Sequence, residues 1–186
     1  DKSSELMAGI HDSLCINLED QVLVVKVDDD INVVKFQDAF RTEFKNDENF
    51  ICKLKSDLRS ELGYIKKMTI HNEYPLDNED TAYCLDTNYY VLDIFALTVA
   101  QGIGYSLRSF SVFPGKLCIV SCIAELRRND NEEPIWRIRL KGESGISSNY
   151  YAKDGISILN ASKNCMVKLA EFVKIGNETK KSIHSF

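Results

Sequence analysis

The residue types that could carry catalysis or hold a metal ion are few in this sequence, and their spacing does not bring them together. No two of the six cysteines form a CxxC pair, and no histidines have the spacing of the HExxH zinc helix. The sequence therefore predicts no metal site, no cofactor and no catalytic residue. The cysteines are Cys15, Cys52, Cys84, Cys118, Cys122 and Cys165, and the histidines are His11, His71 and His184.

Two enzymatic alternatives stay open, because catalytic partners meet in space rather than along the chain. Cys84 with His71 would supply a thiol nucleophile and a base, although no local feature of the sequence predicts an activated thiolate at Cys84. A serine hydrolase is the other alternative, but Ser144 in "KGESG" is one place out of register with the GxSxG nucleophile elbow. The segment "GIGY" lacks the third glycine and the following helix of a phosphate-binding loop.

Two acidic clusters, Asp28–Asp30 and Asp77–Asp80, raise the question of calcium binding. Neither has the glycine and the distal glutamate of an EF-hand loop. Anionic side chains stabilise the positive end of a helix, so we expect Asp30 or its neighbours to cap the helix predicted to follow.

The net charge is −5, from 23 basic and 28 acidic side chains. An acidic chain has no long-range attraction to a phosphate backbone, which argues against nucleic acid as a partner. No run of 18 apolar residues exists, so no membrane-spanning helix is predicted.

The segment after Pro134 alternates apolar and cationic residues around the only tryptophan of the chain. This period of two predicts a β-strand with Trp136, Ile138 and Leu140 toward the core and Arg137 and Arg139 toward solvent. The turn "NDNEEP" joins it to the apolar run Leu117–Leu126, so an antiparallel pair is expected.

Hydrophobic periodicity predicts the other elements. Strands are expected at 22–27, 64–71 and 89–99, with Gly102 and Gly104 ending the last of them. Phenylalanines at 36, 40 and 44, and apolar residues at 51, 54, 58 and 62 before Gly63, predict one or two amphipathic helices. A C-terminal helix is predicted to stop near Gly176.

These elements predict an α+β fold, a two-layer sandwich in which helices cover one face of a mostly antiparallel sheet of about five strands. We expect a mobile N-terminal segment over residues 1–16, one globular domain over 17–176 and a tail over 177–186. The cysteines leave two states open. Six could form up to three bridges in an oxidising compartment, whereas Cys118 and Cys122, in an apolar run, also fit buried free thiols.

Segments 22–50, 58–64, 89–100 and 116–144, followed by the final helix, carry a resemblance to a known class of proteins. Over Gln21 to Lys174 the chain resembles small bacterial cell-envelope lipoproteins, including the auxiliary lipoproteins of ABC-type transport systems and outer-membrane assembly proteins. The resemblance implies a signal peptide and a lipid-attachment cysteine upstream of Asp1, and a non-enzymatic periplasmic domain that binds partner proteins or supports a transport or assembly system.

The resemblance marks fold positions and assigns no binding residue. We expect partner binding at the outward arginines, Arg137 and Arg139, and at the long polar connector that holds Tyr74 and Tyr83. The alternative to an envelope protein is a cytosolic interaction or immunity-type protein that neutralises a basic partner through its acidic loops. The oligomeric state stays open.

Overall fold

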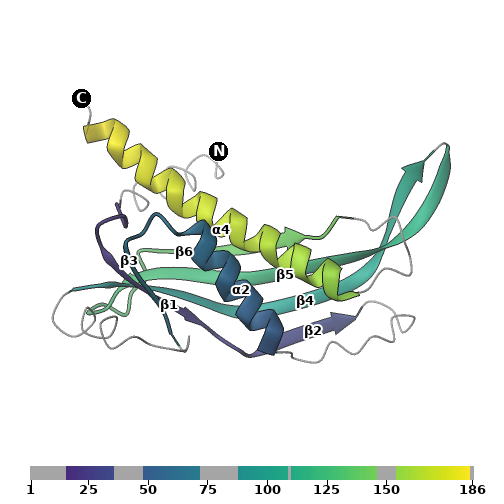
Figure 1. Cartoon of the computed structure of the whole chain (residues 1–186), viewed down its shortest axis with the longest axis horizontal. Coiled ribbons are helices and arrows are strands. Elements are labelled where there is room, and N and C mark those ends of the chain that lie inside the picture. The colour runs from purple at the N-terminus through teal and green to yellow at the C-terminus, as the bar shows by residue number, and fades with distance from the viewer. Residues whose placement is uncertain (1–15, 36–47, 72–87, 109, 146–153, 185–186) are drawn as a thin grey trace.

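The computed structural model describes residues 16–35, 48–71, 88–108, 110–145 and 154–184, which form one sheet with two helices packed on it (Figure 1). The α+β class predicted from the sequence is confirmed, and the sheet has six strands. In chain order the elements are β1 (Val22–Val27), β2 (Ile31–Lys35), α2 (Glu48–Glu61), β3 (Lys67–Ile70), β4 (Tyr90–Arg108), β5 (Ser111–Arg128), β6 (Trp136–Glu143) and α4 (Asp154–His184).

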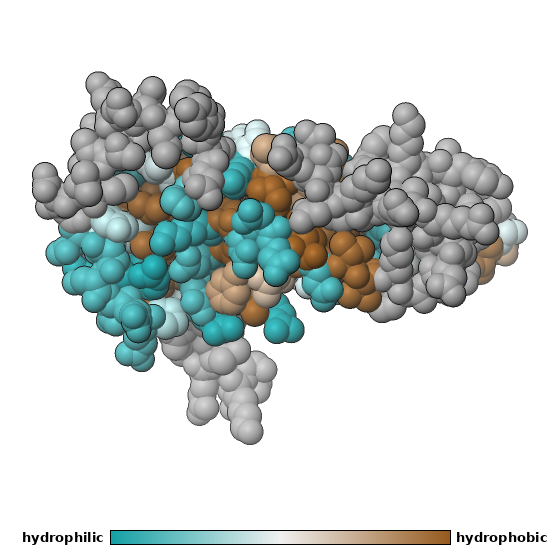
Figure 2. All heavy atoms as spheres, turned by 90° about the horizontal axis from the view of Figure 1, so that it is seen from below, coloured by the Kyte–Doolittle hydropathy of each residue, from teal (hydrophilic) through white to brown (hydrophobic). Residues whose placement is uncertain are grey.

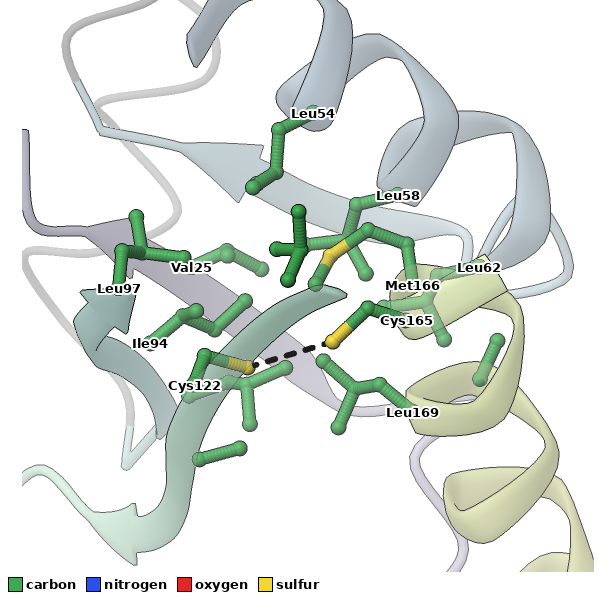
Figure 3. Close-up of a cluster of buried hydrophobic side chains, with 14 of the residues drawn as sticks. Val25, Leu54, Leu58, Leu62, Ile94, Leu97, Cys122, Cys165, Met166 and Leu169 are labelled. Atoms are coloured by element: carbon green, nitrogen blue, oxygen red, sulfur yellow. Dashed lines mark hydrogen bonds between the residues drawn. The ribbon is translucent and has the colours of Figure 1, made fainter. Parts of the chain in front are cut away.

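Both described helices lie on one face of the sheet (Figure 1). Leu54 and Leu58 of α2 are fully buried, as are Met166 and Leu169 of α4. They meet the sheet residues drawn in Figure 3, and together these side chains form the hydrophobic core. The 3.6-residue period of both helices supplies the apolar stripe that this packing needs.

The sheet is mixed, with the strand order β3-β1-β4-β5-β6 and β2 beside β4. β1 is parallel to β3 and β4, and β2 is parallel to β4. β4–β5 and β5–β6 are antiparallel, so the predicted antiparallel pair around the "NDNEEP" turn is confirmed. Parallel pairing of β1 with β3 follows from the chain between them, because parallel neighbours need a crossover and α2 lies within it.

A β-bulge in β4 changes which of its side chains face the helices. Leu92 and Ile94 face the helices before the irregularity, and Leu97 and Val99 do so after it. Ala96, inside the bulge, has a positive φ of 52°. An extra residue on one strand shifts the period of two by one place, which explains why this segment alternates only partly in the sequence.

The acidic segment Asp28–Asp30 joins two strands, so the prediction that Asp30 caps a helix is wrong. β1 pairs with β4 before the bulge and β2 pairs with it afterwards. The N–H of Asp30 donates to Asp28 Oδ1 at 3.0 Å, and the N–H of Asp28 donates to the carbonyl of Ile94 at 2.9 Å. A carboxylate that bonds the backbone two residues ahead stabilises a turn. The second acidic cluster, 77–80, lies outside the described residues.

Gly102 and Gly104 do not end β4, contrary to the prediction. They pair with Leu117 and Gly115 of β5, and the strand continues to Arg108. Cross-strand hydrogen bonds therefore outweigh the low strand propensity of glycine here. The result is a long β4–β5 hairpin that extends past the rest of the sheet, seen as the curved ribbon on the right of Figure 1.

The C-terminal helix is also longer than predicted. α4 continues through Gly176 to His184, so the predicted end near Gly176 is wrong. Glycine inside a helix costs about 1 kcal/mol and does not by itself end it. The helix predicted at Phe36, Phe40 and Phe44 lies outside the described residues. None of the helices described here has the combination of length and apolarity that crossing a membrane requires.

The tryptophan-bearing strand has the orientation predicted from its sequence. Trp136 is 7% exposed and meets Phe172 of α4 edge to face, with ring centroids 5.1 Å apart. Ile138 and Leu140 pack against the same core, whereas Arg137 and Arg139 are exposed. The two faces of β6 thus separate apolar from cationic side chains as a period of two requires.

Because of Tyr64, which follows α2, we expect the protein to lose stability at high pH. Its hydroxyl has no hydrogen-bond partner in the described structure, and burial, with a smaller effect of the Glu19 carboxylate, raises its pKa to about 12. Between pH ~10 and ~12 the unfolded chain loses this proton and the folded chain keeps it, so the free energy of unfolding falls as pH rises. We expect a decline of about 1 kcal/mol, after allowing for partial exposure to solvent.

Urea unfolding of the protein and of Tyr64→Phe across this pH range measures the decline. The phenylalanine variant keeps the ring but has no proton to lose, so the difference between the two stability curves should grow from pH ~10 upward. Parallel curves would show that Tyr64 titrates alike in the folded and unfolded chains.

Candidate binding surface

The face of the sheet opposite the helices carries a row of charged residues, one from each of four neighbouring strands. Lys26 of β1 pairs with Asp93 of β4, Asp93 with Glu125 of β5, and Glu125 with Arg137 of β6. Direct cross-strand partners project from the same face. The neighbours of each along its strand belong to the core, so this row must lie on the side opposite α2 and α4.

Ion pairs hold the arginines of this face in place. Arg137 Nη1 lies 3.0 Å from Glu125 Oε1, and the guanidinium lies 5.5 Å from the centroid of the Phe95 ring. Arg127 Nε lies 3.3 Å from Asp93 Oδ2, with both side chains about a quarter exposed. Each carboxylate of the row therefore already has a cationic partner. Exposed pairs of this kind contribute at most about 1 kcal/mol each.

An open depression of about 320 Å³ lies between β1, β4 and β5. Its lining includes no histidine, cysteine or serine, so it offers no nucleophile–base pair. Among the described residues no group of three or more histidine, cysteine, aspartate or glutamate side chains could hold a metal ion. The lining residues are Lys26, Val27, Asp28, Asp93, Ile94, Phe95 and Glu125.

The residues predicted to bind a partner are only partly described. Arg137 is 57% exposed and held by Glu125 and Phe95, and Arg139, two residues along the same strand, is exposed. Tyr74 and Tyr83 lie outside the described residues, and so does Cys84 of the alternative nucleophilic pair. His71, its proposed base, is exposed at the end of β3. The structure thus orients the arginines outward, and their binding role stays a prediction.

A second surface was not predicted from the sequence. We call it the β4–β5 arm, residues 102–108 with 110–117. β2 ends opposite Gln101, and β6 ends opposite Ile119. Beyond these two positions no described strand pairs with either outer edge, so the arm is a two-stranded ribbon. A ribbon of two strands is marginally stable without further packing.

The end of the arm exposes apolar side chains. Phe110 is 102% exposed, relative to the reference for its residue type, and Val112 is 63% exposed. Phe110 also has a φ of 64°, in the left-handed region where glycine or asparagine is favoured. The backbone thus holds a large aromatic ring in solvent in a conformation that this residue type rarely adopts. A sequence signal was present, because "SLRSFSVFPGK" places aromatic residues beside a hairpin turn.

Figure 2 shows the molecule from below the view of Figure 1, with hydrophobic side chains in brown and hydrophilic ones in teal. Teal side chains gather on the left. Brown side chains run through the middle and reappear at the far right, the end at which the hairpin lies in Figure 1. In this view the hydrophilic side chains are thus densest toward the end away from the hairpin.

Comparison with known proteins gives weak structural likenesses. No protein family and no curated protein matches the sequence. A Xanthomonas campestris protein of the family DUF330 has a TM-score of 0.45 at 12% identity, over 91% of each chain. A minor lipoprotein from Acinetobacter baumannii has a TM-score of 0.40 at 10% identity, over 87% of this chain and 92% of that one.

A third solved structure is the PelC dodecamer from Paraburkholderia phytofirmans, with a TM-score of 0.41 at 12% identity. It is matched over 86% of this chain and 90% of its own. The similar structures thus include a bacterial lipoprotein, but identities and TM-scores this low assign the chain to no family.

Proposed function

We propose that this protein is a non-enzymatic binding domain of the bacterial cell envelope that contacts a partner protein through the β4–β5 arm. The proposal depends mainly on one observation: a two-stranded ribbon, whose edges no described strand pairs with, ends in an exposed phenylalanine and an exposed valine. Covering one such side chain stabilises a complex by about 1.5 to 3 kcal/mol. Envelope location is supported by the resemblance of the sequence to cell-envelope lipoproteins.

The backbone hydrogen-bonding groups on the edges of the arm favour a protein over a lipid bilayer as its binding partner. Both outer edges present N–H and C=O groups that no described strand satisfies. Hydrocarbon cannot pair with these groups, and each costs several kcal/mol there. An extended segment of another protein can pair with them by adding a strand to the edge.

The charge of the arm indicates what kind of segment this is. Residues 102–117 include Arg108 and Lys116 and no acidic residue, although the whole chain carries a net charge of −5. A partner segment that combines acidic and apolar side chains would complement this composition. An acidic partner also differs from the basic partner of the cytosolic alternative, so the sign of the partner's charge distinguishes the two.

Photo-crosslinking in the cells that produce the protein tests the contact. A benzoyl-phenylalanine at position 110 keeps an aromatic ring at the end of the arm, and the same residue at Glu132, exposed in the β5–β6 turn, is the matched control. We expect one protein adduct from position 110 and none from 132. Val112→Ser should reduce recovery of that protein about tenfold, the effect of losing about 1.4 kcal/mol.

Three results would contradict the proposal. Equal adducts from both positions would show a surface without specificity, an adduct with a second copy would show self-association, and an adduct with lipid alone would show a membrane contact. Cell fractionation tests the location separately. The protein is expected with the envelope fraction, and recovery with the cytosol would support the alternative.

A further inference from the structure

Two buried cysteines face each other across the layer between the helices and the sheet. Cys122 Sγ of β5 and Cys165 Sγ of α4 are 3.7 Å apart, although the residues are 43 positions apart in the chain. Their side chains are 1% and 0% exposed. In Figure 3 they point toward one another inside the hydrophobic core, between strand and helix.

The backbone of α4 also lies close to the sheet at this point. Gly142 of β6 is next to the site, and a Cβ placed on it would lie 2.3 Å from the backbone nitrogen of Cys165. Helix and sheet are therefore in direct contact beside Cys165. For a disulfide to form, the sulfurs would have to approach from 3.7 Å to the bonding distance of about 2.05 Å.

The two thiols have different electrostatic surroundings. The hydrogen bond with Cys165 and burial raise the pKa of Cys122 above its ordinary value. The same hydrogen bond, with the positive charge of Lys168, lowers the pKa of Cys165 against the opposing effect of burial. The thiolate is the attacking species in disulfide exchange, and the positive charge of Lys168 favours a thiolate at Cys165.

We propose that Cys122 and Cys165 form a disulfide bond that ties α4 to the central strand β5 when the chain meets a disulfide oxidant. The Cys165 thiolate attacks one sulfur of oxidised glutathione, and one glutathione thiolate leaves. Cys122 then loses its proton and attacks the mixed disulfide at Cys165, which releases the second glutathione thiolate. Two thiol protons pass to the two released thiolates, so the cysteine pair loses two electrons and one glutathione disulfide gains them.

Burial determines when this reaction takes place. A folded core excludes glutathione, so the bond forms during folding or when α4 opens away from the sheet. Once formed, it closes a loop of more than forty residues, which constrains the unfolded chain. We expect the melting temperature to rise by about 5 to 10 °C. The bond is independent of the β4–β5 arm, so its absence would not affect the partner contact.

The test is oxidative refolding followed by peptide mapping. The reduced, unfolded chain is refolded in a mixture of reduced and oxidised glutathione, remaining thiols are blocked with iodoacetamide, and the digest is mapped without reductant. We expect a linked pair of peptides holding Cys122 and Cys165, together with the higher melting temperature. Cys118→Ser is the matched control, because it removes a buried thiol of the same strand and should leave both results unchanged.

Cys122→Ala and Cys165→Ala should each abolish the linked peptides and the rise in melting temperature. The wild-type map by itself decides whether the bond forms, so a variant that fails to fold leaves the test intact. Blocked thiols at both positions after refolding, or a link from either cysteine to another one, would overturn the inference. Linked peptides without a higher melting temperature would overturn the stabilising role.

Discussion

Gly142→Ala is expected to lower the free energy of unfolding by about 3 kcal/mol. The new Cβ would lie 2.3 Å from the carbonyl oxygen of Ala161, 2.3 Å from the nitrogen of Cys165 and 2.8 Å from its Cα. All three are backbone atoms of α4, so no side-chain rotation relieves the overlap. The helix must move away from the sheet, which opens the core around Met166 and Leu169. Urea unfolding followed by circular dichroism measures the change.

Gly145→Ala is the matched control for this substitution. It makes the same chemical change three residues away, where no atom lies within 4 Å of the new Cβ but φ is 73°. Only the backbone penalty applies there, about 1 kcal/mol. If the two variants lost equal stability, the close approach of α4 to β6 at Gly142 would be disproved.

Trp136→Ala is expected to lower the free energy of unfolding by about 4 kcal/mol, the range for removing a large aromatic side chain from a core. Trp136 is 7% exposed, and its edge-to-face contact with Phe172 is lost with it. The substitution leaves a cavity between β6 and α4 where the indole met Phe172. Because Trp136 is the only tryptophan, fluorescence reports on its burial, and we expect a blue-shifted emission maximum from the folded wild-type protein.

Arg137→Ala, at the next position of β6, is the control for Trp136→Ala. It tests whether the loss of stability comes from the burial of the side chain rather than from its place on the strand. The Arg137 side chain is 57% exposed, and its loss removes one ion pair and one cation–π contact. Solvent screens both, so we expect a change below about 1 kcal/mol. If Arg137→Ala lowered the free energy of unfolding more than Trp136→Ala, the side of β6 that carries Arg137, and not the side that carries Trp136, would face the core.

Elements whose side chains carry a local period could be predicted from the sequence. The alternation around Trp136 predicted the buried and exposed faces of β6, and the spacing of Leu54, Leu58 and Leu62 predicted α2 and its buried stripe. Burial of Cys118 and Cys122, expected from their apolar run, is what the structure shows. In each case the apolar residues of one face must be covered whatever lies opposite, so the pattern is sufficient.

Errors arose where tertiary contacts outweighed local propensity. Gly102, Gly104 and Gly176 were interpreted as ends of elements, but β4 and α4 continue through them. Pairing with β5 supplies hydrogen bonds that propensity does not count. Asp28–Asp30 was interpreted as a helix start, and it became a turn between strands because β2 pairs with β4.

Local patterns in the sequence were sufficient to predict the α+β class, the two faces of β6 and the stripe of α2, because each depends on a repeat within a few residues. Four features became visible only in the folded chain: the parallel pairing of β1, the side-chain switch at the β4 bulge, the exposed end of the β4–β5 arm and the approach of Cys165 to Cys122. Each of these joins residues far apart in the chain, or depends on where a neighbouring strand ends. No local period encodes such distances, since they arise only when distant segments pack together.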